Sequence, residues 1–183
     1  MKNIFGIWVL ASSMWAMTAC SSSSTKEEEL KGETEEVVDF YKGADISWAT
    51  EMESKGHRFY NNEGQARECT ALMKEYGMNA IRLRVWVDPS KHDNWCNKED
   101  VLLKAKRAKA LGMEVMVDFH YSDWWADPAK QMVPKAWASM TMRQKPNAVK
   151  KYTNECLTLL KEAGVDVGMV QVGNETNGAM CGE

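Results

Sequence analysis

The segments EYGMNAIRL (75–83), ALGMEVMVD (110–118) and EAGVDVGMV (162–170) share one pattern. In each, the end of a helical sequence is followed by a glycine and a short link, and then by an apolar stretch with the character of a strand. The connections that lead from a strand to the next helix are long by comparison. Repeated joints of this kind are typical of stacked parallel βα units.

The elements between these joints indicate the class of α/β fold. Strands are predicted at 42–47, 79–87, 114–121 and 166–174, and helices at 63–76, 98–111 and 147–163. The long, aromatic and charged loops follow the strands, as they do in (β/α)8 TIM barrels. A doubly wound open sheet is the alternative, but its glycine-rich phosphate-binding fingerprint is missing from the sequence.

The length of the regular part limits how much of a barrel it can form. A complete barrel needs about 250 residues, and residues 42–183 contain only four predicted strands. We therefore expect these residues to be the N-terminal half of a (β/α)8 catalytic domain, truncated after about strand four. An unclosed sheet of this kind would expose unpaired edges.

The first residues read MKNIFGIWVLASSMWAMTAC (1–20). A lysine precedes an apolar stretch too short for a comfortable membrane span, and small residues precede Cys20. This resembles the lipobox of bacterial lipoproteins, which implies a signal peptide at 1–19 and a lipid on Cys20; an ordinary secretory signal is the alternative. Residues 20–41, rich in serine and glutamate, are predicted to form a disordered tether. The predicted location is the bacterial cell envelope, anchored by lipid in the outer membrane, and surface exposure is left open.

Charge and cysteine content exclude some classes of function. The formal net charge is −3, and no basic stripe of the kind found in nucleic-acid-binding proteins is present. The four cysteines after Cys20 do not have the spacing of a zinc site, and no metal site is predicted. One or two disulfides or buried free thiols are both compatible with their positions, which are Cys69, Cys96, Cys156 and Cys181.

Strand periodicity separates a polar face from an apolar one. In AIRLRVW (80–86) the two arginines and the tryptophan alternate with aliphatic residues, and in EVMVDFH (114–120) Asp118 and His120 share a face. The apolar sets suit packing against outer helices, so the polar sets should face the barrel axis. Because a buried charge needs a partner, Arg82 or Arg84 should pair with Asp118. We expect a structural role for Arg82.

Glu175 is the strongest catalytic candidate. It ends the last predicted strand and follows an amide residue, Asn174. Cleavage of a glycosidic bond requires one carboxylic acid to protonate the leaving oxygen and a second carboxylate across the sugar ring. An adjacent asparagine can donate a hydrogen bond to a sugar hydroxyl. The sequence therefore favours a glycosidase.

Four stretches carry a resemblance to one family: GADIS (43–47), IRLRVWVDP (81–89), VDFHYSDWWADPAKQMVPKAW (117–137) and VQVGNETNG (170–178). Together they resemble glycoside hydrolase family 53, the retaining endo-β-1,4-galactanases of clan A, which act on type I arabinogalactan and pectic galactan. The resemblance covers residues 42–183 and implies a galactan or arabinogalactan substrate and no cofactor. Some members carry calcium in a late loop, which the resemblance would place beyond this chain.

The resemblance also implies the roles of individual residues. The catalytic set is Glu175 as acid/base, Asn174 on the sugar 2-hydroxyl, Arg84 near the nucleophile, and His120. The substrate-binding set is Asp45, Asp118, Trp86, Trp124 and Trp125. Trp124 stands where members have threonine, and it either extends the sugar platform or simply packs. The family's nucleophile, a glutamate late in the barrel, has no counterpart here, so this chain alone is expected to be inactive.

Two other functions remain open at this point. One is a different clan A endo-β-glycanase that attacks mannan or glucan. The other is a non-catalytic surface lipoprotein that captures glycans through its tryptophans. In each case the partners are a polysaccharide and, through the lipid on Cys20, a membrane.

Overall fold

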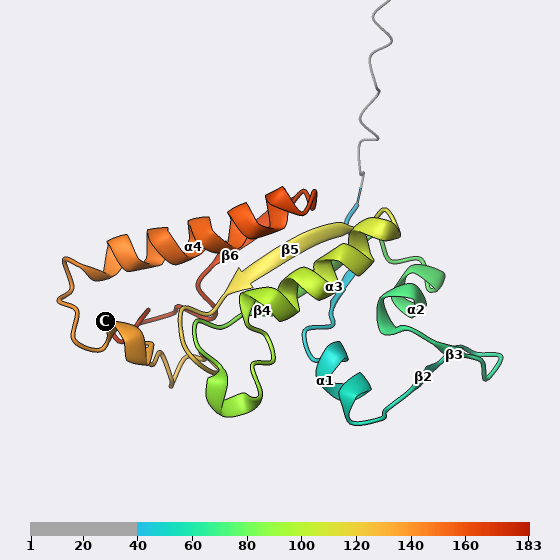
Figure 1. Ribbon diagram of the computed structural model, residues 1–183, viewed down its shortest axis with the longest axis horizontal. Helices are drawn as coiled ribbons and strands as arrows, with labels where there is room; N and C mark the ends of the chain where they lie inside the picture. The colour runs from blue at the N-terminus through green and yellow to red at the C-terminus, as the bar shows by residue number, and fades with distance from the viewer. Residues whose placement is uncertain (1–39) are drawn as a thin grey trace, which may run out of the picture. The chain divides into compact units, whose positions relative to one another are not determined.

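The computed structural model describes residues 40–183; the predicted signal peptide, the predicted lipidation site Cys20 and all but the last two residues of the predicted tether lie outside these residues. Its main sheet contains β1 (Gly43–Asp45), β4 (Ala80–Val85), β5 (Glu114–Phe119) and β6 (Met169–Val172). All neighbouring strands are parallel, in the order β1-β4-β5-β6 (Figure 1). Each strand lies beside the preceding strand of this sheet, with no reversal of the kind that creates the switch point of a doubly wound sheet. The prediction of parallel α/β units is confirmed.

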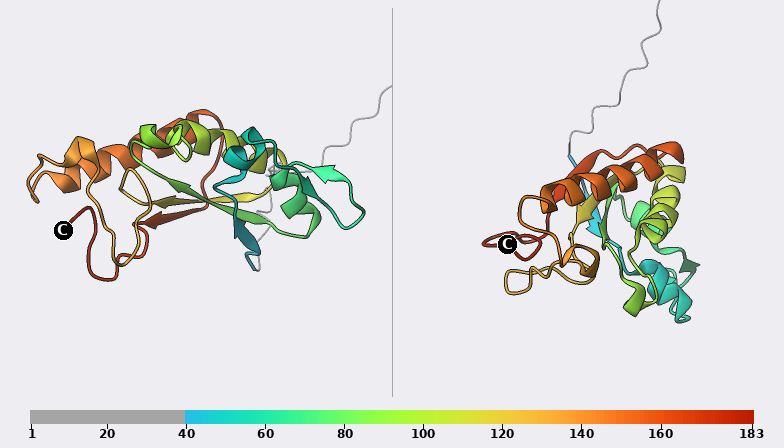
Figure 2. Two further views of the ribbon diagram at one scale, coloured as in Figure 1. Left: turned by 90° about the horizontal axis from the view of Figure 1, so that it is seen from below. Right: turned by 60° about the vertical axis from the view of Figure 1, so that its left-hand side comes forward.

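The apolar side of the sheet is covered by α3 (Lys98–Ala110) and α4 (Lys145–Glu162) (Figures 1 and 2). The alternating residues of β4 and β5 predicted to face the helices are buried in one core with apolar residues of both helices. Its members include Ile81, Leu83, Val85, Val115, Val117, Phe119, Val101, Ala105, Cys156 and Leu160. The apolar faces of these two strands were therefore predicted correctly, and the opposite faces carry the polar residues.

The helix predicted at 63–76 is wrong in its first half. β2 (Phe59–Tyr60) and β3 (Ala66–Arg67) form an antiparallel hairpin, and α2 spans only Cys69–Glu75. The Asn61 side chain accepts a hydrogen bond from the backbone of Gln65, and this bond closes the turn. The turn also places Gly64 at φ +73°, where a residue without Cβ is favoured.

Short elements were not predicted from the sequence. These are α1 (Ala49–Ser54) and the 3-10 helices η1 (Ser90–His92) and η2 (Lys135–Trp137). The four strands of the main sheet are shorter than predicted, and α4 begins two residues earlier than predicted. No helix within residues 40–183 combines the length and apolar character that a membrane span requires.

A buried lysine connects α3 to the turn that follows β1. Lys104 is fully buried, and its Nζ lies 2.7 Å from the backbone oxygen of Ser47 and also forms an ion pair with Asp100. The hydroxyl of Ser47 in turn accepts a hydrogen bond from the backbone N–H of Arg84 at 2.8 Å. Helix α3 thus fixes the turn at Ser47, and this turn contacts the backbone of β4 at Arg84.

The four cysteines of the described residues are buried free thiols, so the disulfide alternative is not realised in this structure. Burial raises the pKa of the Cys69, Cys156 and Cys181 thiols to about 11. A thiol that stays protonated in the fold is a weak nucleophile. These cysteines therefore behave as small core residues.

Within residues 40–183 both edges of the sheet, β1 and β6, are open. Among residues 40–183, β6 pairs only with β5, and Val170 and Val172 on its apolar side are partly or largely exposed. This agrees with the expectation of an unclosed barrel. A free parallel edge with exposed valines is a surface on which another strand can pair.

Candidate active site

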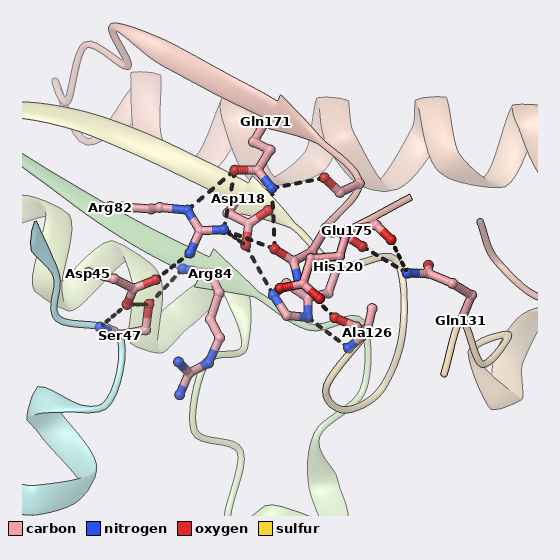
Figure 3. A network of polar contacts seen from close by, with 12 residues as sticks. Asp45, Ser47, Arg82, Arg84, Asp118, His120, Ala126, Gln131, Gln171 and Glu175 are labelled. Carbon is pink, nitrogen blue, oxygen red and sulfur yellow. Dashed lines mark hydrogen bonds and ion pairs between the residues drawn. The ribbon is translucent and has the colours of Figure 1, made fainter. Parts of the chain in front are cut away.

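The predicted polar residues meet on the face of the sheet opposite α3 and α4. Arg84 lies in register with Asp118, and Asp118 with Gln171, so three adjacent strands present polar side chains at one level. His120 and Asn174 follow where β5 and β6 end. Figure 3 shows that Asp118, Gln171 and His120 belong to one network of hydrogen bonds and ion pairs.

Arg82 is the centre of this network. Its Nη1 lies 2.6 Å from Asp45 Oδ2 on β1, and its Nη2 lies 2.7 Å from Asp118 Oδ2 on β5. Nη2 also donates to Asn174 Oδ1 at 3.0 Å and to Gln171 Oε1 at 3.2 Å. One guanidinium therefore links all four strands of the sheet. The pairing of Arg82 with Asp118 and its structural role agree with the expectation from the sequence.

His120 has both ring nitrogens occupied. Its Nδ1 accepts a hydrogen bond from the backbone N–H of Ala126 at 3.0 Å, which places the proton on Nε2, 3.0 Å from Asp118 Oδ2. The side chains of His120 and Asp118 are almost completely buried. The geometry favours a positioning role for both residues over direct contact with a ligand.

Within the described part of the chain, Arg84 is buried without a carboxylate partner. It is 5% exposed, and its Nε has no hydrogen-bond partner among the described residues. Its Cζ lies 4.2 Å from the ring centre of Trp125 and 4.9 Å from that of Trp86, within the range of a cation–π contact. In Figure 3 the guanidinium points away from the network around Arg82. A buried cation in this state can receive an anionic group.

The three tryptophans differ in what they can offer a ligand. Trp86 is buried beneath the other two, so here it supports them. Trp124 stacks on His92 with ring centres 3.3 Å apart and lies 4.3 Å from Trp86, yet it is 39% exposed. Trp125 is 44% exposed, with the Arg84 guanidinium against its ring. Trp124 therefore packs against two rings and also keeps an open part, so both exposed indoles can offer a surface to a ligand.

A left-handed turn presents Glu175. Gly173 has φ +88°, and a Cβ at that position would lie 2.5 Å from Thr176 Cγ2. Glu175 also has positive φ, at +50°, which is uncommon for a residue other than glycine. Asn174 is buried, and its Nδ2 donates to the backbone oxygen of Ala126 at 2.7 Å. The amide of Asn174 is thus fixed, and it retains a second N–H.

The Glu175 side chain is exposed, and its carboxylate accepts no hydrogen bond from the described residues. The two other acids that the sequence placed in the site are already engaged, Asp45 by Arg82 and Ser47, and Asp118 by Arg82 and His120. Glu175 is therefore the uncommitted carboxylate of this polar face. It has the access to solvent that an acid/base group requires.

Gln171 and Gln131 are parts of this arrangement that the sequence reasoning missed. Gln171 could have been predicted from the sequence. Alternation along the strand places Gln171 and Gly173 on one side and Val170 and Val172 on the apolar side. Gln131 lies in the long loop after β5, and no periodic pattern marks it. Two surface pockets of about 670 and 700 Å³ lie against α4 and the first residues of α3, and neither contains a predicted site residue. The first of them is also lined by the loop after β4 and by η2.

Comparison with known proteins identifies relatives of this arrangement. Residues 41–183 match the family model described as glycosyl hydrolase family 53. The endo-β-1,4-galactanase of Bacillus subtilis (strain 168) is 45% identical over 151 residues, covering 79% of this chain and 35% of the relative. The arabinogalactan endo-β-1,4-galactanase of Cellvibrio japonicus is 40% identical over 139 residues, covering 75% of this chain and 36% of the relative.

Solved structures give the same result. The family 53 catalytic domain of Ignisphaera aggregans superimposes with a TM-score of 0.73 at 40% identity, covering 78% of this chain and 41% of that one. A fungal β-1,4-galactanase gives 0.72 at 36% identity, covering 76% and 41%. The chain thus spans 35–41% of the length of these relatives. Its sheet corresponds to part of a (β/α)8 barrel, and the chain belongs to glycosyl hydrolase family 53.

Proposed function

We propose that a protein of full family length containing this chain hydrolyses internal β-1,4-galactosidic linkages of galactan or arabinogalactan. The observation that carries this proposal is the free, exposed carboxylate of Glu175 beside the fixed amide of Asn174, at the end of β6. The substrate is suggested by the relatives at 40–45% identity, which are named as galactanases. No comparable observation supports mannan or glucan.

In the proposed reaction Glu175 begins as a carboxylic acid. It gives its proton to the glycosidic oxygen as the bond from that oxygen to the anomeric carbon breaks, while a second carboxylate forms a bond to that carbon from the opposite face. Glu175, now ionised, takes a proton from a water molecule that attacks the same carbon and releases the sugar. The configuration at the anomeric carbon is retained, and the two carboxyl groups should lie about 5–5.5 Å apart.

The neighbouring residues have roles that suit this reaction. The free N–H of Asn174 Nδ2 can donate to a sugar hydroxyl, in a contact that strengthens as positive charge develops on the ring. Arg84, buried and without an acidic partner among residues 40–183, is suited to orient the second carboxylate. Trp125 offers an exposed ring on which a sugar can stack.

The substrate is tested with a panel of polymers. The full-length protein should release oligosaccharides from β-1,4-galactan at least about tenfold faster, by kcat/KM, than from β-mannan or β-glucan. The 183-residue chain by itself should release none, because double displacement needs both carboxylates. Faster cleavage of mannan or glucan would overturn the substrate, and binding of galactan without any cleavage would favour a glycan-capturing protein.

We further propose that the protein is lipidated on Cys20 and held at the bacterial outer membrane. The support is the sequence alone: a short apolar leader, small residues before Cys20 and a polar segment after it. In bacteria fed an alkyne-labelled palmitate, the protein should carry the label, and Cys20→Ser should not. Equal labelling of both proteins, or of neither, would contradict the anchor.

A further inference from the structure

We propose that Gln131 is the residue that positions the acid/base carboxylate. This inference rests on the proposed role of Glu175. Gln131 lies in the loop between β5 and α4, 44 residues before Glu175 in sequence. Its side chain reaches the turn that presents Glu175, and the two appear beside each other in Figure 3.

The contacts of Gln131 are with the backbone of that turn. Its Nε2 lies 2.8 Å from the carbonyl oxygen of Asn174 and 3.4 Å from that of Glu175. The same nitrogen lies 3.2 Å from the carbonyl oxygen of Asp127 in its own loop. One amide therefore joins the loop after β5 to both residues of the Asn-Glu pair.

The orientation of this amide is determined by its surroundings. All three neighbouring groups are carbonyl oxygens, which accept hydrogen bonds, so the donating NH2 must face them. The side-chain oxygen Oε1 is buried and has no hydrogen-bond partner among the described residues. Burying the unsatisfied oxygen costs free energy of folding. The 2.8 Å hydrogen bond from Nε2 to the carbonyl oxygen of Asn174 gives a reason for the presence of a glutamine here.

The position of Glu175 depends on its backbone. Its carboxylate accepts no hydrogen bond from the described residues, so no side-chain contact fixes it. Its φ of +50° is held by a turn in which Asn177 N–H donates to the Glu175 carbonyl oxygen at 2.8 Å. Gln131 is the side chain that ties the carbonyl oxygens of Asn174 and Glu175 to the loop after β5, whereas Gln171 donates to Gly173 and Asn174 Nδ2 to Ala126. Loss of the Gln131 donor should allow the turn to relax and the carboxyl group to move.

A displaced acid has a distinctive kinetic effect. Misplacement by about 1 Å can cost on the order of 100-fold in rate, but only for a step that needs the proton. A sugar leaving group such as the rest of a galactan chain needs protonation, whereas dinitrophenolate leaves without it. The kcat/KM of a retaining enzyme reports the steps up to glycosyl transfer, so comparing these substrates separates loss of the acid from general damage.

The test is Gln131→Leu in the full-length protein, with Met132→Ala as the matched control. Met132 is the next residue of the same loop, and its side chain is 64% exposed. For Gln131→Leu we expect kcat/KM on galactan to fall by about 10- to 100-fold, with a change of less than about threefold on dinitrophenyl β-galactobioside. Met132→Ala should leave both values unchanged.

Glu175→Gln provides the reference, because it removes the acid altogether and should show the same split between substrates, but larger. Suppose that Gln131→Leu lowers kcat/KM equally on both substrates, or lowers it on neither, while Glu175→Gln lowers it much more on galactan. The positioning role of Gln131 is then wrong and the proposed function stands. If Glu175→Gln shows no split, both proposals are wrong. Should Gln131→Leu not fold, Gln131→Met, which keeps an unbranched side chain without the donor, is measured in the same way.

Discussion

Replacing Glu175 by glutamine in the full-length protein should lower the turnover of β-1,4-galactan by about 10²- to 10⁴-fold. Glutamine has nearly the same shape as glutamate but cannot transfer a proton to the glycosidic oxygen. Folding should be nearly unaffected, because the Glu175 carboxylate is exposed and has no hydrogen-bond partner among the described residues. The measurements are galactan hydrolysis by release of reducing ends, and Tm.

The matched control is Glu162→Gln, which makes the same chemical change at an exposed glutamate near the end of α4. It should leave both turnover and Tm unchanged. Added azide should partly restore the turnover of Glu175→Gln on an activated aryl galactoside, because azide attacks the glycosyl-enzyme without needing a base. Galactan turnover equal to that of the unchanged protein would remove Glu175 from the acid/base role.

The parts of this site that the sequence predicted are those set by alternation along a strand. In β4, Leu83 is fully buried under the helices and Arg84 faces the opposite side, as a period of two requires. The parallel joints predicted which strands are adjacent, so a pairing between an arginine of β4 and Asp118 of β5 could be anticipated. Both inferences depend on burial, which produces a periodic pattern of apolar residues in the sequence.

The parts that could not be predicted depend on register and on contacts with the backbone. Arg82 reaches Asp45 and Gln171 because three strands place these side chains within the span of one guanidinium. This depends on the register between strands, which the sequence of a single strand does not determine. Gln131 binds carbonyl oxygens, which every residue possesses, so no residue type at the other end of the contact reveals it.

The hairpin β2–β3 illustrates a different kind of error. Ala66 and Cys69 happen to fit a helical spacing, although Ala66 lies in a strand and only Cys69 lies in a helix. Asn61 and Gly64 are turn signals, and they decide the local structure through the Asn61 side chain and the positive φ of Gly64. Periodicity over a short window was overridden by turn chemistry. This error lies outside the polar face and therefore did not affect the site.

The Arg82 network connects stability to the site, because the guanidinium that neutralises two acids also contacts Asn174 next to Glu175. Arg82→Met should keep most of the side-chain volume but leave Asp118, which is completely buried, with His120 as its remaining partner. We expect the free energy of unfolding in urea to fall by about 2–4 kcal/mol. This is slightly below the range for fully buried ion pairs, since Arg82 is partly exposed. Galactan turnover should fall as well.

A double-mutant cycle with Asp118→Asn separates the charge from the packing. In Arg82→Met the penalty comes mainly from an uncompensated carboxylate, so removing the charge of Asp118 should recover part of the lost stability, while an asparagine oxygen can still accept from His120 Nε2. The double variant should therefore lose about 1–3 kcal/mol less than the sum of the two single changes. Strictly additive losses would mean that Arg82 stabilises the sheet through its contacts to Asp45, Gln171 and Asn174, and that Asp118 is balanced without it.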